Sequence, residues 1–218
     1  MSMPESVNIT CPQCAHVGKA IMWKSLNGML DPEAKAQLLD GSLFMYLCDN
    51  CKHSFSLNYP ILYNDMVNNV MIYYVLSEKD VPEVEAVLVE TEGMKVELGA
   101  GNFKPQYRIV TSQNALREKA IVFEQQLDDR LVEIMKLLYR AQLMKKFPDA
   151  EITEIFFFAE EGNFFFEVIG NIPTTMKFNV ELYSALQKDA EHLLKDTQND
   201  HEVDALWAER VLHDSEME

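Results

Sequence analysis

The strongest constraint on the fold is the placement of the cysteines, because all four fall into two Cys-x-x-Cys pairs, Cys11 with Cys14 and Cys48 with Cys51. A thiol pair on a tight turn directs both sulfur atoms toward one point. Two such turns provide four thiolates, which hold a zinc ion tetrahedrally at Zn–S distances of about 2.3 Å. When protein fills all four positions, none is left for water or substrate, and the binding energy becomes folding energy. The pairs therefore predict one structural zinc ion.

Two other interpretations of the cysteine pairs stay open. A Cys-x-x-Cys pair can exchange disulfides, which makes a thiol oxidoreductase one alternative. An iron–sulfur centre is the other. A redox pair would leave the second pair unexplained, and no βαβ pattern surrounds either. His16 and His53 lie just after the pairs, and we interpret them as polar turn residues beside the metal. Glycine is frequent in such turns at the positions that Ala15 and Lys52 occupy.

The N-terminal half shows mainly strand patterns. β-Branched and aromatic residues predict strands at 17–26, 43–47, 55–62, 70–76 and 106–111, with a turn at 63–65 between two of them. A short helix is expected to begin at Pro32, with Asp31 as its N-cap, and to end near Gly41. Residues 80–101 are ambiguous: Val81 could open a short helix that ends near Gly93, and residues 99–102 are expected to form a loop.

The C-terminal half begins with a long helical pattern that runs from Ser112 to Phe147. Unbroken, it would be about 35 residues or ~52 Å long, which exceeds the width of a small domain. The helix must therefore break or pack on a partner. Within it, Asp128 and Asp129 do not face each other, and a surface salt bridge to Arg130 is expected.

Two apolar runs follow, at 155–158 and 164–169, around a turn that contains Gly162, and they predict a β-hairpin. The hairpin is apolar on both faces, so both need cover. The long helix can cover one face, and the other needs the C-terminal helix or a second subunit. Asn179 is expected to cap the next helix, and residues 203–212 form the last one.

Charge and hydropathy exclude some partners. The net charge is −16, and Lys and Arg do not cluster. Because nucleic-acid affinity depends on basic groups that displace counterions, nucleic acid is disfavoured as a partner. No apolar run is long enough for a transmembrane helix. The N-terminal residues lack the pattern of a secretory signal, so a cytoplasmic location with reduced thiols is expected.

The residues around the cysteine pairs also resemble a family, the CpXC-domain proteins of bacteria and archaea. The first pair, Cys11-Pro12-Gln13-Cys14, carries the motif with proline in second place. More specific is the segment LDPEAKAQLLDGSLFMYLCDNCKHSFSLNYPILYND, followed by MIYYV, YRIV and NALREKAIVFEQQLDDRLVE. The likeness covers roughly residues 8 to 135. It implies metal-type ligands at the four cysteines and brings no biochemical activity that could be transferred to this chain.

These observations predict an α+β protein. A zinc-ribbon-type β module with an inserted short helix is expected at 1–111. A long helix, a β-hairpin and C-terminal helices are expected at 112–218, packed on or continuous with the first part. The over-long helix and the two-faced hairpin favour a non-enzymatic protein-interaction module that self-associates. The alternatives are an enzyme with a pocket near Tyr59 and Tyr63, and the thiol oxidoreductase.

Overall fold

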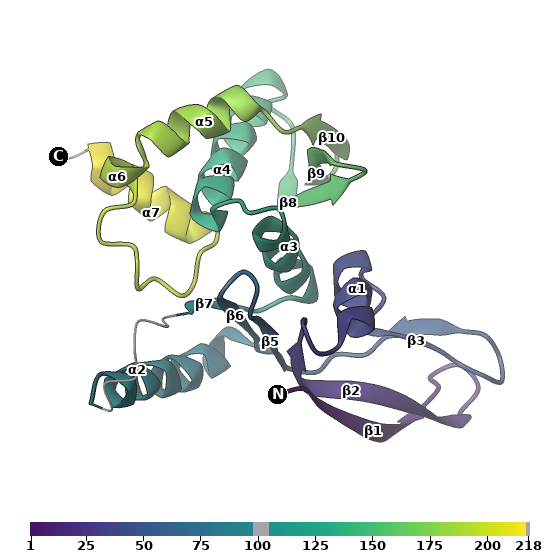
Figure 1. Cartoon of the computed structure of the whole chain (residues 1–218). Coiled ribbons are helices and arrows are strands. Elements are labelled where there is room, and N and C mark those ends of the chain that lie inside the picture. The colour runs from purple at the N-terminus through teal and green to yellow at the C-terminus, as the bar shows by residue number, and fades with distance from the viewer. Residues whose placement is uncertain (98–104, 217–218) are drawn as a thin grey trace. The chain divides into compact units, whose positions relative to one another are not determined.

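The computed structural model describes residues 1–97 and 105–216, which carry both helices and strands, as expected for an α+β protein (Figure 1). The chain divides into two compact units, Met1–Arg117 and Glu118–Glu218. No helix among the described residues is long and apolar enough to cross a membrane. The expected loop at 99–102 lies outside the described residues.

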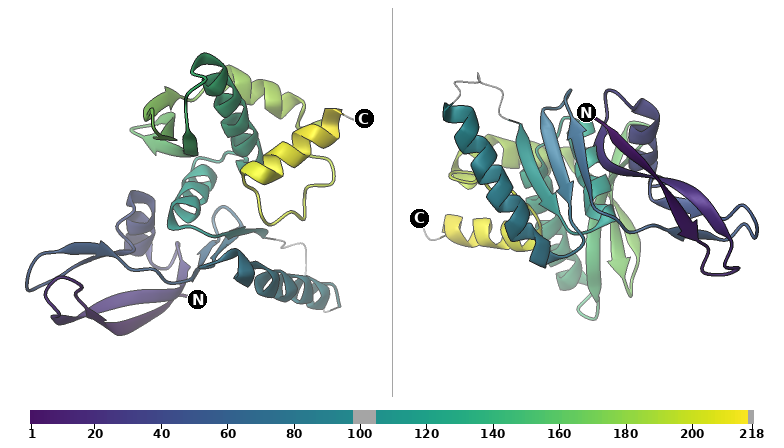
Figure 2. Two further views of the ribbon diagram at one scale, coloured as in Figure 1. Left: turned by 180° about the vertical axis from the view of Figure 1, so that it is seen from behind. Right: turned by 90° about the horizontal axis from the view of Figure 1, so that it is seen from below.

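The first unit is built on a five-stranded sheet with the order β1-β2-β5-β6-β7 (Figure 2). Its strands are β1 Met3–Thr10, β2 Val17–Asn27, β5 Ile61–Asp65, β6 Val70–Tyr74 and β7 Gln106–Val110. β1 and β2 form an antiparallel hairpin, and β6 and β7 are parallel. A parallel pair needs a crossover connection, which includes helix α2, Val81–Glu97. This helix is longer than the short one that the sequence suggested.

Helix α1, Pro32–Asp40, follows the prediction closely. Pro32 occupies the first turn, and Gly41 ends the helix with a φ of 86°, in the left-handed region that favours glycine. A small hairpin comes next, with strands β3, Met45–Leu47, and β4, Ser54–Ser56.

The single strand expected at 55–62 is wrong, because the structure has β4 and β5 there with an irregular segment between them. Pro60 lies in that segment and lacks the N–H that a ladder position requires. The turn expected at 63–65 is also wrong. These residues end β5, and the turn follows at 66–69, where Asn69 has a φ of 55°.

The long helix expected from Ser112 onward is two helices, α3 Gln113–Glu124 and α4 Asp129–Lys146. Gln126 adopts a φ of 58°, which ends α3. Asp128 then caps α4, since its Oδ1 accepts a hydrogen bond from the Arg130 N–H at 3.0 Å. The break removes the over-long helix as a reason to expect a partner.

The second unit contains a three-stranded antiparallel sheet in the order β10-β9-β8. Strands β8, Ile152–Glu160, and β9, Asn163–Gly170, form the predicted hairpin. Its turn has positive φ at Glu161 and Gly162, as a tight hairpin turn requires. The sequence did not reveal the short third strand, β10, Thr174–Lys177.

One face of this sheet forms an aromatic core. Phe157 and Phe166 are buried there and pack on Phe178, each with its ring centroid 5.8 Å from that ring. The opposite face carries Phe158 and Phe165, which stack on each other and are half-buried. Aromatic side chains therefore lie on both faces, as predicted, but the opposite face also carries the exposed Glu154 and Glu167.

The remaining helices of the unit are α5 Val180–Lys188, α6 Ala190–Leu193 and α7 Ala205–Glu216. Asn179 caps α5 as expected, with its Oδ1 accepting from the Leu182 N–H at 2.9 Å.

Candidate metal centre

The two Cys-x-x-Cys turns meet in the first unit. Each cysteine contributes its sulfur atom to one cluster, and the four sulfur atoms lie within 4.8 Å of one another. The Cys11 and Cys51 Sγ atoms are 3.6 Å apart, and those of Cys14 and Cys48 are 3.7 Å apart. A tetrahedral ion with Zn–S bonds of about 2.3 Å would hold its sulfur atoms about 3.8 Å apart. The cluster therefore has the dimensions of a tetrathiolate metal site.

The backbone builds both turns in the same way. In the first, the Ala15 N–H donates to the Cys11 carbonyl at 3.0 Å, and the Cys11 N–H donates to the His16 carbonyl at 2.9 Å. The second turn repeats both bonds at 2.9 Å, from Lys52 to Cys48 and from Cys48 to His53. The two histidines thus contribute carbonyl groups to the turns.

The residue after each pair adopts a left-handed backbone. Ala15 has a φ of 57° and Lys52 a φ of 61°. This conformation explains why glycine is frequent at these positions, because a Cβ is strained there.

The cysteine cluster joins two hairpins. Cys11 follows β1 and Cys48 follows β3, and both are buried. They pack with Ala20 of β2 and Tyr46 of β3 into one small core. Partly buried side chains complete this core: Val7, Ile9, Cys14, Cys51, Phe55 and Leu57.

The Cys14 and Cys51 thiols differ in acidity. The Asn50 side-chain amide donates to Cys14 Sγ at 3.6 Å and is the main reason that the pKa of Cys14 falls to about 6. At Cys51 the His53 backbone lowers the pKa, but burial and the neighbouring thiols outweigh it and raise the pKa to about 12. Crowding by the other thiols therefore resists ionisation of Cys51, and a bound cation would favour its thiolate.

The sequence model of the CpXC protein family matches residues 9–136, more than half of the chain. The chain belongs to the CpXC family. The match includes both cysteine turns and ends within α4, so the aromatic sheet of the second unit lies outside it. Comparison with the curated proteins and with the solved structures finds no match.

One feature of the CpXC site, the contact between Gly18 and Tyr46, was not predicted from the sequence. A Cβ on Gly18 would overlap with the Tyr46 hydroxyl, so only glycine leaves room for it. That hydroxyl is buried and has no hydrogen-bond partner among the described residues. Burial, and then the charge of Asp49, raises the pKa of Tyr46. The available signal was a glycine inside a strand pattern, which marks a close approach.

Tyr59 and Tyr63, beside which a substrate pocket was considered, are both core residues of the CpXC region, with 4% and 0% of their surfaces exposed. The Tyr59 ring packs on Phe44 with centroids 5.0 Å apart, and the Tyr63 hydroxyl donates to Asp65 Oδ2 at 3.1 Å. Their burial removes the reason for placing a substrate between them.

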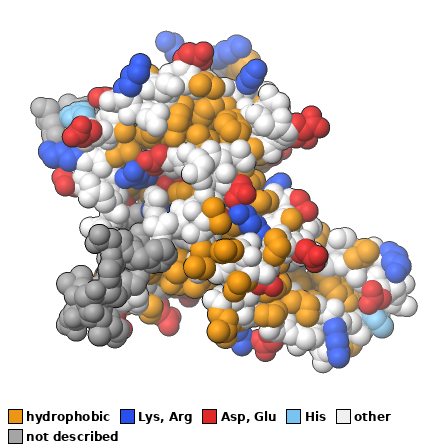
Figure 3. Space-filling view, in the orientation of Figure 1, with side chains coloured by type: hydrophobic (Ala, Val, Ile, Leu, Met, Phe, Trp, Pro, Cys, Tyr) orange, Lys and Arg blue, Asp and Glu red, His pale blue; other side chains and the backbone are white. Residues whose placement is uncertain are grey.

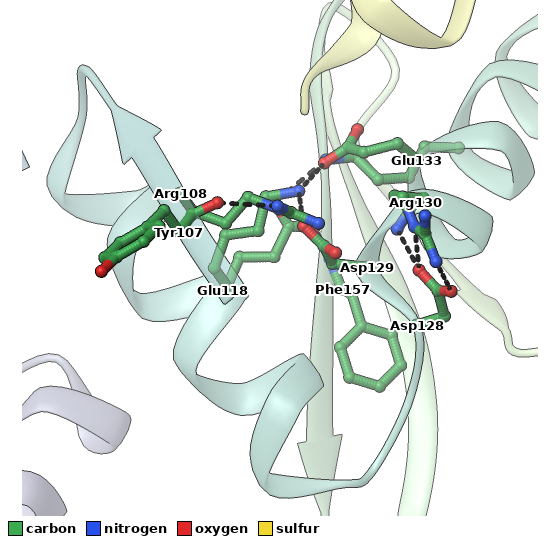
Figure 4. Close-up of polar contacts among 10 residues, drawn as sticks. Tyr107, Arg108, Glu118, Asp128, Asp129, Arg130, Glu133 and Phe157 are labelled. Carbon is green, nitrogen blue, oxygen red and sulfur yellow. Dashed lines mark hydrogen bonds and ion pairs between the residues drawn. The ribbon is translucent and has the colours of Figure 1, made fainter. Parts of the chain in front are cut away.

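A second polar cluster, the ion network, lies inside the second unit (Figure 4). Lys119 bridges Asp129 at 3.0 Å and Glu133 at 3.2 Å, and Lys136 bridges Glu133 at 3.0 Å and Glu118 at 2.9 Å. Burial raises the pKa of Glu118. Burial lowers the pKa of Lys136, but Glu118 and Glu133 outweigh it and raise that pKa.

The expected salt bridge between Asp128 and Arg130 is present at 2.7 Å. Its neighbour Asp129 is fully buried and belongs to the ion network, which the sequence did not indicate.

Proposed function

We propose that this CpXC chain is a non-enzymatic protein-interaction module whose N-terminal hairpins are held together by one structural zinc ion. The observation that carries the proposal is the closed set of four sulfur atoms within 4.8 Å. Four protein ligands complete a tetrahedral sphere, so the ion has no position for a substrate or a reactive water. Zinc in this site stabilises the fold that carries a binding surface.

The distances within the cluster favour a metal over a thiol oxidoreductase. An oxidoreductase forms its disulfide within one Cys-x-x-Cys motif. Here sulfur contacts of 3.6 and 3.7 Å also join different turns, Cys11 to Cys51 and Cys14 to Cys48, so the two motifs form one cluster of four sulfur atoms. Thiolate ligation needs reduced cysteines, which supports a cytoplasmic location.

The surface of the zinc-bearing hairpins supports the interaction role. Large apolar side chains are exposed there on β2 and β3. They are Val17, Ile21, Met45 and Leu47. Figure 3 shows hydrophobic side chains gathered over the part of the molecule that these strands form. Exposed apolar groups concentrated in one region are typical of surfaces that bind other proteins.

Chelation of the full chain tests the structural role of zinc. After zinc is stripped, we expect amide exchange to accelerate throughout β1–β4, while the aromatic sheet of the second unit keeps its protection. Re-addition of zinc should restore the hairpins. Unchanged exchange in β1–β4 after complete metal removal would contradict the proposal, as would a catalytic turnover that depends on the metal.

A further inference from the structure

Strand β1 forms one edge of the five-stranded sheet (Figure 2). Residues 6–10 of this strand are exposed or half-buried along their whole length. An edge strand presents a row of backbone N–H and C=O groups that another strand can pair with.

The register identifies which groups of β1 point outward. Successive residues of an antiparallel strand bond alternately toward the partner strand and away from it. The Cys11 N–H donates toward β2, to the His16 carbonyl, so Ile9 and Val7 also bond to β2. The backbone groups of Ser6, Asn8 and Thr10 therefore face outward. Among residues 1–97 and 105–216 no hydrogen bond to these outward groups is found.

This edge lacks the devices that usually prevent strand addition. Between residues 6 and 10 there is no Lys, Pro or bulge, and the only register irregularity lies at Met3 and Pro4. Glu5, the nearest acid, is paired with Lys24 at 2.8 Å.

Strand β8 shows how the same chain closes an edge. The Phe157 N–H on its free side donates to Glu118 Oε1 at 2.6 Å. Arg140 donates to the Ile152 carbonyl at 2.6 Å and to the Thr153 carbonyl at 3.3 Å. Side chains thus occupy three of the free backbone groups of β8, whereas no such contact to the outward groups of β1 is found among the described residues.

Charge and self-complementarity indicate a second copy of the chain as the occupant. At a net charge of −16, two copies repel each other over most of their surfaces, but residues 6–10 are uncharged. In an antiparallel pair centred on Asn8, Ser6 faces Thr10 and Val7 faces Ile9 of the other copy. These are hydroxyl–hydroxyl and aliphatic pairs, which favour strand pairing. Val7 and Ile9 already pack on the cysteine cluster.

We infer that β1 pairs antiparallel with β1 of a second copy, around a two-fold axis at Asn8, to form a dimer with one continuous sheet. This inference rests on the proposed function and names one partner, a second copy of the chain that binds at the β1 edge. Because only a short strand is paired, the dimer is weak and depends on concentration.

The test substitutes Asn8 by proline in the full chain. Asn8→Pro removes the outward N–H at the centre of the pair and leaves the bonds to β2 intact, because proline is tolerated where an edge N–H faces solvent. Asn8→Thr, which keeps the N–H, is the matched control. In sedimentation equilibrium over a concentration series, the wild type and Asn8→Thr should approach twice 25.1 kDa, while Asn8→Pro stays at 25.1 kDa with its zinc retained.

A wild type that is monomeric at every concentration would overturn the inference. A dimer that persists in Asn8→Pro would also overturn it, while leaving the zinc-held module to the chelation test. If Asn8→Pro fails to bind zinc, amide exchange of the wild type decides. The amides of Ser6, Asn8 and Thr10 should slow as concentration rises, and amides that exchange equally at all concentrations would contradict β1 pairing.

Discussion

Both units of the chain place ionisable groups in their interiors, but they compensate the charge differently. In the second unit the buried carboxylates of Glu118, Asp129 and Glu133 are bonded to Lys119 and Lys136. In the first unit the four thiols have one other side-chain donor among the described residues, the uncharged amide of Asn50. A group of thiolates without internal cations needs a cation from outside. Zinc should therefore control the first unit and leave the second unchanged.

The hydrophobic cores of the two units also differ, in their size and in the residues that fill them. The second unit has a large aromatic core around Phe157, Phe166 and Phe178, which stabilises the fold through apolar burial. The hairpins of the first unit share a small core in which cysteines replace much of the apolar bulk. Small cores commonly need a metal or disulfides to be stable.

The largest expected effect comes from removing a buried ligand. Cys48→Ser should abolish zinc binding and unfold the hairpins, since structural zinc contributes an apparent ~10–16 kcal/mol in small zinc domains. Metal content and amide exchange measure this. His53→Gln is the matched control, because the structure uses the carbonyl of His53, and it should keep its zinc. If the Cys48→Ser protein kept a full zinc content and slow amide exchange in its hairpins, zinc would not be what stabilises the first unit.

Breaking the ion network should destabilise the second unit alone. Lys119→Met leaves Asp129 and Glu133 without this partner, which costs about 3–5 kcal/mol for a buried pair. Denaturant unfolding followed at Trp207, the tryptophan of this unit, reports the change in a Trp23→Phe background.

Lys24→Met in the first unit is the control for this experiment. It removes an exposed pair with Glu5 and should leave the unfolding midpoint unchanged. If Lys119→Met behaves like Lys24→Met, the network does not stabilise the second unit. If Lys119→Met causes the first unit to release zinc, the stabilities of the two units are not independent.

The contact between Gly18 and Tyr46 should give a smaller effect inside the hairpins that carry the cysteine cluster. Gly18→Ala forces a Cβ into the Tyr46 hydroxyl and should lower stability by about 1–3 kcal/mol. Tyr46→Phe removes that hydroxyl, so the double variant should recover the loss. Thermal unfolding of the zinc-loaded wild type, both single variants and the double variant measures these changes in stability. A double variant as unstable as Gly18→Ala would show that the clash lies elsewhere.

The smallest effect is expected where the turns hold left-handed residues. Ala15→Gly and Lys52→Gly relieve the backbone strain of a left-handed residue, which stabilises the folded state. Glycine also raises the conformational entropy of the unfolded chain, which offsets part of this gain. Each variant should therefore stabilise the zinc-loaded form by about 1 kcal/mol or less. Calorimetry of both variants would detect this. Gly substitution at Lys19, which lies within β2 and opposite Asn8 of β1, should destabilise instead. A loss of stability at Ala15 would argue against the strained conformation.

The sequence predicted the features that local chemistry determines. The spacing of the cysteines indicated both turns, proline and glycine bounded α1, and Gly162 marked the hairpin. These signals act over a few residues and need no knowledge of the rest of the fold.

Features that depend on contacts between different helices or hairpins were not predicted from the sequence. The apolar spacing continues through the break between α3 and α4, which depends on a left-handed Gln126 and the Asp128 cap. Asp129 looked like a surface residue because its partner Lys119 lies on another helix. The fit of Gly18 to Tyr46 likewise joins residues on different hairpins.

The most direct test of the account is elemental analysis of the purified native chain, combined with X-ray absorption at the zinc edge. We expect one zinc per chain, with four sulfur neighbours at about 2.3 Å and no oxygen or nitrogen ligand. A metal-free folded protein, iron in place of zinc, or oxygen or nitrogen in the zinc shell would contradict it.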